Sequence, residues 1–345
     1  MIEIKDFNTL YDGTETHLVI LRNEQKTEVS ITNYGGIITS IRTADRKGHL
    51  ENIVLGYSHI DDYQCEHPFF GAVIGRYANR IEGSRFSLDG ETYHLTPSEG
   101  ENQLHGGKKG FDKVLWNIES TTDDTLTLSY SSPDGEEGFP GTLKVFVSYK
   151  LTNQNELIIS YKAETDKPTV INLTNHSYFN LTGNPGRHIL EHELQLHSNY
   201  YTPVDEQSIP TGELAAVEGT PFDFTQPKPI GRDIHLLENG YDHNYVLGER
   251  LEDAPRMVAR LKEPHSGRVL ETLTDKPGIQ LYTGAGLQPV PGTKGGQNFR
   301  KFGGVCLETQ FFPNSPNMPD FPSCFFTPDK PYQSTTIYRF SLDND

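Results

Sequence analysis

Four short stretches of this sequence carry side chains that can bind or move protons where β-structure usually carries apolar ones. The first is 75–81, in which Arg76, Asn79 and Arg80 follow a long apolar run. Amide and guanidinium groups match the spacing of vicinal hydroxyls, so this stretch could bind a neutral sugar. The alternative is a strand end whose arginines are solvated or paired with nearby acids.

The second and third stretches each contain a histidine. His105 precedes Gly106 and Gly107, and glycines let a backbone approach a ligand closely. The alternative is a loop histidine before a turn. His176 lies in the strand-like run 170–181, which is crowded with Asn, Thr, Ser and Tyr, and buried polar groups of this kind must all find partners. We therefore expect hydrogen-bonding machinery around His176, and the three Asn-x-Ser/Thr sequons of this run belong to it.

The fourth stretch, 304–310, places Glu308 in the middle of a β-type run. An unpaired carboxylate is costly to bury, so this side chain either faces solvent or is held for chemistry. In the second case desolvation would raise its pKa. Alternation leaves both options open, because Glu308 shares a side of the strand with Cys306 rather than with Leu307.

The elements that would position these residues are strands. Apolar and polar residues alternate with period two in 143–151, 126–130, 157–161 and 338–342. Asp89-Gly90 between two short runs is a hairpin signal, and a single helical turn is expected near 60–63. Many short strands with almost no helix predict an all-β fold, a large antiparallel β-sandwich. No linker or repeat divides the chain, so residues 1–345 are expected to form one domain.

Charge and cysteine content limit the partners. The formal net charge is −17, from 30 basic and 47 acidic residues. Such a surface repels phosphate backbones and anionic membranes, so we expect neither nucleic acid nor a membrane as partner. Cys65, Cys306 and Cys324 form no CxxC pair, and the first residues lack a basic leader and an apolar core. Both features favour a cytoplasmic protein with free thiols.

Two motifs that suggest a bound metal or nucleotide fail on their context. Residues 188–192 match the HxxEH pattern of zinc peptidases, but that chemistry needs a helix and the following residues alternate like a strand. Residues 284–286 lack the third glycine and the βαβ setting of a dinucleotide site. We therefore expect no metal and no cofactor.

Taken together and in order, these motifs resemble those of the aldose 1-epimerase family. The similar runs are 75–81, 104–107, 175–181, 241–244, 277–280 and 307–310, with 33–36 and 312–317 flanking them. The resemblance covers nearly the whole chain, and six motifs in register are far more specific than any one of them.

The resemblance implies a galactose mutarotase-like supersandwich that binds free aldohexoses such as galactose and glucose without a cofactor. Carried over by position, it implies that Glu308 is the general base and His176 the general acid. It also implies a set of residues that contact sugar hydroxyls: Asn79, Arg80, His105, Asp242 and Gln280. Arg76 matches a first arginine that would stand one layer behind them.

The chemistry of anomer exchange fits these residue types. The hemiacetal must open, turn about C1–C2 and close again, which needs a base for the anomeric hydroxyl and an acid for the ring oxygen. A nearby carboxylate, Glu308 or Asp242, should keep His176 charged near neutral pH. The protein would act on a monosaccharide as a monomer or homodimer.

Three alternatives remain open at this point. A glycoside hydrolase would use Glu308 and Asp242 as its two carboxylates. A sugar-binding protein would have the same site without turnover. A relative acting on a hexose phosphate would need a basic pocket, which the net charge argues against.

Overall fold

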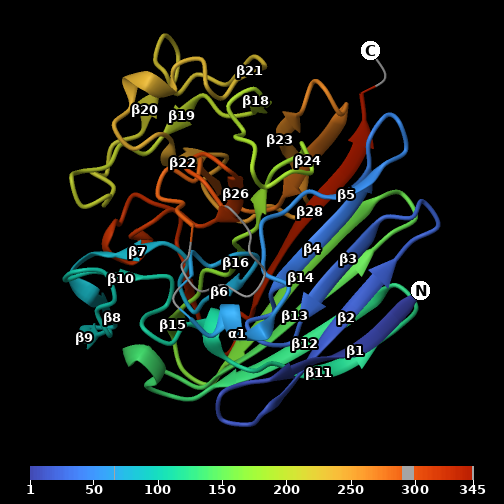
Figure 1. Ribbon diagram of the computed structural model, residues 1–345. Helices are drawn as coiled ribbons and strands as arrows, with labels where there is room; N and C mark the ends of the chain where they lie inside the picture. Colours follow the sequence, from blue (N-terminus) through green and yellow to red (C-terminus); the bar gives the residue numbers. More distant parts are fainter. Residues whose placement is uncertain (66, 290–298, 344–345) are drawn as a thin grey trace.

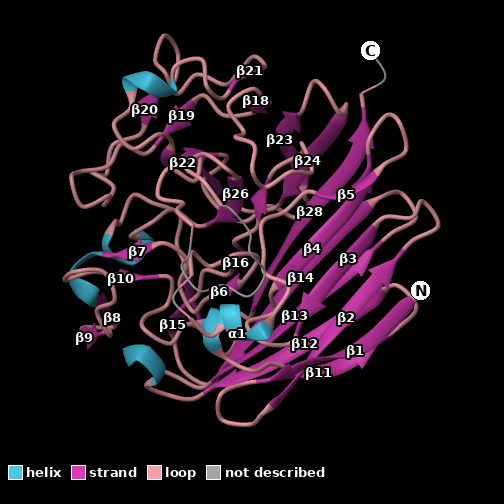
Figure 2. Ribbon diagram, viewed as in Figure 1, coloured by secondary structure: helices cyan, strands magenta, loops and turns pink. Residues whose placement is uncertain are grey.

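The computed structural model describes residues 1–65, 67–289 and 299–343 (Figure 1). Regular structure in this part of the chain is almost entirely strand (Figure 2), and every sheet is antiparallel at the strand pairs that form it. The predicted all-β class is therefore confirmed. The expected helical turn is α1 (Ile60–Tyr63). Single 3-10 turns occur at Glu82–Ser84, Phe111–Lys113, Glu136–Gly138, Ile234–Leu236 and Ser315–Asn317. Among the described residues no helix has the length and apolar character needed to cross a membrane.

The largest sheet has nine strands in the order β11-β12-β13-β14-β28-β24-β23-β18-β21. Their bounds are β11 (Asn117–Thr121), β12 (Thr125–Ser132), β13 (Leu143–Leu151), β14 (Glu156–Thr165), β28 (Tyr332–Leu342), β24 (Arg268–Thr274), β23 (Arg256–Lys262), β18 (Glu193–Leu196) and β21 (Lys228–Pro229). Along β13 each odd-numbered residue is buried, whereas Lys144 and Lys150 are exposed. The alternation predicted for 143–151 thus marks a strand with one buried face.

A five-stranded sheet covers part of that face. It runs in chain order through β1 (Ile2–Thr9), β2 (Glu15–Arg22), β3 (Glu28–Thr32), β4 (Ile38–Ala44) and β5 (Leu50–Asn52). In Figure 1 the blue strands β1–β4 lie against the green strands β12–β14. One apolar cluster joins Val19 and Val29 of the smaller sheet to Val145 and Val147 of the larger one. This cluster shows that the core lies between the two layers. Burial of each side chain of this size contributes about 1.5–3 kcal/mol to the stability of the fold.

A six-stranded sheet carries most of the predicted site. Its order is β17 (Tyr178–Phe179), β26 (Val305–Gln310), β25 (Gly278–Tyr282), β22 (Asp242–Val246), β19 (Tyr200–Tyr201) and β20 (Ala215–Ala216). Strand β26 is attached to β28 of the large sheet. Tyr338 Oη donates to the Leu307 carbonyl at 3.1 Å, and the hydroxyls of Thr309 and Thr336 lie 2.5 Å apart. The long sheet therefore supports the strand that carries Glu308.

Four short strand pairs complete the fold: β6 (Val73–Ile74) with β16 (Thr174–Asn175), β7 (Arg80–Ile81) with β10 (Gln103–Leu104), β8 (Arg85–Leu88) with β9 (Glu91–His94), and β15 (Thr169–Val170) with β27 (Phe325–Phe326). The β8–β9 hairpin is the one that the sequence predicts. Asp89 and Gly90 form its turn, with φ of 53° and 82°, which a two-residue turn of this type requires.

Candidate active site

Strand register brings His176 and Glu308 together. In the β17–β26 pair Tyr178 lies opposite Cys306. Antiparallel partners step in opposite directions, so two residues further on His176 falls opposite Glu308. Nε2 of His176 lies 3.7 Å from Oε1 of Glu308. The amide of His176 also donates to the Ala72 carbonyl at 2.9 Å, which extends the β6–β16 pair and fixes the backbone on its other side.

The same rule places His105 beside Asn79. Strands β7 and β10 pair Ile81 with Gln103. Two residues further along the pair, Asn79 falls opposite His105. The His105 amide donates to the Asn79 carbonyl at 3.1 Å, and the Asn79 amide donates to His105 Nδ1 at 3.2 Å. Because Nδ1 accepts, Nε2 of His105 carries the ring hydrogen and can donate to a ligand.

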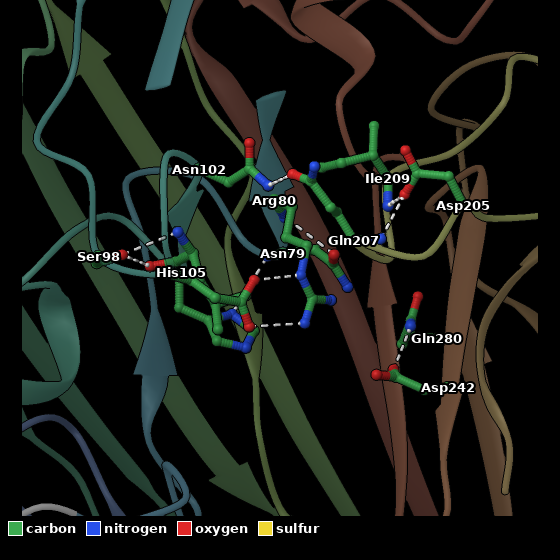
Figure 3. Close-up of polar contacts among 12 residues, drawn as sticks. Asn79, Arg80, Ser98, Asn102, His105, Asp205, Gln207, Ile209, Asp242 and Gln280 are labelled. Carbon is green, nitrogen blue, oxygen red and sulfur yellow. Dashed lines mark hydrogen bonds and ion pairs between the residues drawn. The ribbon is translucent and has the colours of Figure 1, made fainter. Parts of the chain in front are cut away.

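Gln280 and Asp242 extend the cluster across the six-stranded sheet. Gln280 lies directly opposite Glu308 in the β25–β26 pair. Its Nε2 donates to Asp242 Oδ1 at 2.7 Å (Figure 3), and its Oε1 accepts from Gln310 Nε2 at 3.1 Å. The amide of Gln280 is thereby oriented from both ends, and one oxygen of Asp242 is occupied.

Arg80 is held by a partner that the sequence analysis did not find. Its Nε and Nη2 donate to the two carboxylate oxygens of Glu99 at 2.5 and 2.9 Å. This fork geometry fixes the guanidinium plane. Glu99 sits in a loop with no periodic pattern, so no sequence signal marked it. The neighbouring Asn102 donates to Gln207 Oε1 at 3.2 Å, which links this loop to a second one (Figure 3).

Burial sets the protonation of the central pair. The side chains of His176 and Glu308 are only 5% and 3% exposed. Burial lowers the pKa of His176 to about 3. Burial, together with the charge of Asp242, raises the pKa of Glu308 well above its usual value of 4.5. The raised carboxyl pKa was expected, but the expectation that His176 is charged near neutral pH is wrong for the unliganded site, because burial disfavours the imidazolium.

Aromatic rings fix the plane of His176. Its ring stacks on Tyr178, with centroids 5.0 Å apart and planes 20° apart, and on Phe69 at 5.8 Å and 23°. Phe69 reaches this position with φ of 58°, a conformation that bulky residues seldom adopt. The role of Phe69 was not predicted, since its run reads as an ordinary apolar strand.

Arg76 is not part of the cluster. Its side chain is buried and donates to Ser132 Oγ at 2.7 Å and to the carbonyls of Ser132, Pro133, Pro140 and Gly141 at 2.8–3.1 Å. All five guanidinium hydrogens are thereby used, so none remains for a ligand. Its side chain holds the 132–141 segment, so Arg76 stands behind the cluster and not in contact with a sugar.

The glycines after His105 are packed closely against neighbouring segments of the chain. A Cβ on Gly106 would lie 1.9 Å from the Gly75 carbonyl oxygen, and one on Gly107 would lie 2.2 Å from Glu137 Oε2. Neighbouring chain segments therefore leave no room for a side chain at either position.

The hydrogen-bonding machinery expected around His176 is present. Asn172 bridges to the Ala78 carbonyl and to both the amide and the carbonyl of Phe311. Asn175 Nδ2 donates to the Gly71 carbonyl at 2.8 Å, and Asn180 Nδ2 donates to the Gly303 carbonyl at 2.8 Å. The three sequon asparagines are all buried and tie the strands of the site together.

Metal-ligating groups coincide with this site. The ligand atoms of His176, Cys306 and Glu308 all lie within 4.8 Å of one another. Imidazole, thiolate and carboxylate are ligands that Zn²⁺ accepts, so these side chains could hold such an ion. The HxxEH match has no such geometry: Glu193 begins strand β18, and His192 Nε2 accepts from the Leu181 amide at 3.0 Å.

An unpaired oxygen marks the centre of the cluster. Oε2 of Glu308 is buried and has no hydrogen-bond partner among the described residues. A buried polar atom without a partner is costly, and a ligand hydroxyl would supply one. Two surface hollows, one beside Thr127 and Ser334 and one beside Arg22 and Lys150, contain none of the predicted site residues. The chemistry of the side chains, not a large hollow, identifies this site.

Known proteins share this sequence and fold. A sequence model described as aldose 1-epimerase matches residues 17–339. A galactose mutarotase from Sus scrofa is 43% identical over 339 residues, covering 97% of both chains, and one from Homo sapiens is 45% identical over 317 residues, covering 91% of both. A crystal structure of an aldose epimerase homologue from C. elegans superimposes with a TM-score of 0.88 at 29% identity, covering 95% of this chain and 100% of the other. The chain therefore belongs to the aldose 1-epimerase family.

Proposed function

We propose that this protein interconverts the α and β anomers of free aldohexoses, galactose first among them, with Glu308 and His176 as the base and acid. The observation that carries the proposal is the setting of Glu308. Its Oε2 has no partner among the described residues, and its Oε1 lies 3.7 Å from Nε2 of His176. The relatives named galactose mutarotase support galactose as the substrate.

Ring opening needs one proton to leave the sugar and another to enter it. Glu308 takes the proton of the anomeric hydroxyl O1, and the electrons of that O–H bond form the C1=O1 double bond. The C1–O5 bond breaks, and O5 takes a proton from Nε2 of His176. After rotation about C1–C2 the two residues exchange roles and the ring closes on the other face of the carbonyl. Atoms and charges balance without any further reactant.

Burial of the pair suits this cycle. The acid–base pair holds one proton more than the fully deprotonated state throughout, either on His176 or on Glu308. In the unliganded protein burial favours the neutral form, a carboxylic acid facing a neutral imidazole. That form is the one reached after ring opening. Sugar hydroxyls that donate to Glu308 would favour the carboxylate, and so would move the proton to His176 before opening.

The surrounding side chains suit a neutral, hydroxyl-rich ligand. His105 Nε2–H can donate, the second oxygen of Asp242 can accept, and the guanidinium of Arg80 is held in a fixed plane by Glu99. Asn79 and Gln280 would complete the contacts, as the family resemblance implies. The free thiols of Cys65, Cys306 and Cys324 support a reducing compartment, in which we place the protein: the cytoplasm.

The decisive experiment is polarimetry of freshly dissolved α-D-galactose with wild-type protein and with His176→Asn. Wild type should speed the decay of rotation without changing its final value. The variant should lose about a hundredfold or more in kcat with KM little changed, because proton transfer occurs only in the transition state. Spontaneous decay with wild type, for galactose and glucose alike, would favour a sugar-binding protein. New reducing ends from an oligosaccharide would favour a glycoside hydrolase.

A further inference from the structure

Both ring nitrogens of His176 face a side chain. Nε2 lies 3.7 Å from Oε1 of Glu308, and Nδ1 lies 3.6 Å from Sγ of Cys306. Phe69 and Tyr178 both stack on the ring and so hold its plane. In a neutral imidazole one nitrogen carries a hydrogen and the other does not, and the partners decide which. Cys306 is therefore one of two groups that set the tautomer of His176.

Strand geometry explains why a thiol stands there. Cys306 and Glu308 are two residues apart on β26, so their side chains leave the same face of the strand. Cys306 is opposite Tyr178 in the β17–β26 pair, two residues along from the position at which His176 faces Glu308. The imidazole spans the two positions, with one nitrogen toward each side chain.

We propose that Cys306 is a positioning residue: its sulfur accepts the Nδ1 hydrogen of His176, which leaves Nε2 as the nitrogen that exchanges a proton with Glu308 and the sugar. The tautomer follows from contacts seen in the unliganded protein. Its use in turnover rests on the function proposed above.

The one shared proton supports this tautomer. When it sits on Oε1 or on Nε2, it lies between these two atoms, which are 3.7 Å apart. The second ring hydrogen must then sit on Nδ1, where the sulfur of Cys306 is the hydrogen-bond partner. His105 shows the opposite arrangement in the same site, since its Nδ1 accepts from the Asn79 amide. The two histidines are thus held in opposite tautomers.

A thiol is a suitable partner for an acid. Sulfur accepts hydrogen bonds weakly, whereas a carboxylate or carbonyl at Nδ1 would stabilise the imidazolium and make it hold its proton. Burial raises the pKa of the Cys306 thiol well above 9, so the sulfur carries no charge that would have the same effect. Cys306 therefore orients His176 without weakening it as a proton donor.

The tautomer can be measured without turnover. In ¹⁵N-labelled full-length protein the side-chain nitrogens of His176, assigned with His176→Asn, should show hydrogen on Nδ1 and none on Nε2. Cys306→Ala should shift His176 to the other tautomer or to a mixture. Cys324→Ala is the matched control, because Cys324 is also a free, fully buried thiol but interacts with Tyr77 and not with His176, and it should leave the signals unchanged. A wild-type signal with hydrogen on Nε2 would overturn the proposal.

Kinetics separates positioning from stability. Cys306→Ala should lower kcat about fivefold, the size of one ordinary hydrogen bond, with KM unchanged. Cys306→Ser keeps a group that can accept from Nδ1 and should restore most of that loss, whereas Cys324→Ala should keep the wild-type kcat. Wild-type kcat and wild-type signals in Cys306→Ala would reject the inference. If the signals behave as expected but wild type does not speed mutarotation, the tautomer stands and the proposed function fails.

Discussion

Strand β13 buries one of its two faces, whereas strand β26 buries both. In β13 one face is packed and the other carries exposed lysines. In β26 all six residues are buried, among them Glu308, Thr309 and Gln310. The difference arises from position: β13 lies within a sheet with one open face, whereas β26 is covered on both sides. A strand covered on both sides can present polar groups to a site from which water is excluded.

The buried polar residues of β26 differ in how they are satisfied. Thr309 pairs with Thr336 of the long sheet, and Gln310 donates to Gln280. Thr309 is thus paired with the long sheet, whereas Glu308 and Gln310 each keep one oxygen, Oε2 and Oε1, without a partner in the described part of the chain. The predictions below test this division between the nine-stranded sheet and the six-stranded sheet.

The largest effect should come from Glu308→Gln. We expect kcat to fall by about a thousandfold, within the range found for general acid–base groups. Stability at neutral pH should not fall, because a carboxyl whose pKa is raised by folding weakens the folded state once pH exceeds the unfolded pKa, and the amide removes that effect. Polarimetry and thermal unfolding measure the two quantities. Glu271→Gln on β24, where the carboxylate pairs with Arg339 at 3.2 Å, is the control and should keep wild-type kcat.

For a core residue of the nine-stranded sheet we expect a loss of stability without a loss of kcat. Leu128 of β12 is fully buried in the main core cluster. Leu128→Ala should cost about 3 kcal/mol of unfolding free energy, from lost burial and the cavity left behind. Denaturant unfolding gives this value, and kcat per folded molecule should stay unchanged. A large loss of kcat would mean that the long sheet does more than support β26.

Arg80→Ala should act on binding. Removing a charged hydrogen-bond donor that faces the sugar should raise KM about tenfold, with kcat changed by less than about threefold. Arg339→Ala is matched to it, because Arg339 also pairs with carboxylates, Glu156 at 2.9 Å and Glu271, but on the large sheet. If KM is the same in Arg80→Ala and wild type, Arg80 does not contact the sugar.

The smallest expected effect is that of pH on kcat/KM. A second proton on the pair must go to His176, whose pKa burial lowers to about 3. The acid limb of kcat/KM, which reports the free enzyme, should therefore lie well below the usual histidine value of about 6.5. Initial-rate polarimetry, corrected for the spontaneous rate, should find kcat/KM nearly constant between about pH 7 and about pH 5. A midpoint near 6.5 would mean that His176 is solvated.

Sequence reasoning succeeded where local rules decide. Alternation located β13, and Asp89-Gly90 located the β8–β9 hairpin, because period and turn chemistry are properties of neighbouring residues. It could not find that Arg76 faces the 132–141 carbonyls, nor that Glu99 holds Arg80, because these contacts join distant segments. It also misjudged the charge of His176, since that depends on how completely the rest of the chain excludes water.

The hydrogen bond between Asn102 and Gln207 joins two loops beside the site, while the acid–base pair is fixed by strand register. Loops accept insertions and exchanges that strands do not, because a shift of one residue in a strand turns every side chain to the other face. We therefore expect these two loops to accept changes that strands β17 and β26 would not. An engineer who wants another aldose should randomise these two loops together and leave β17 and β26 as they are.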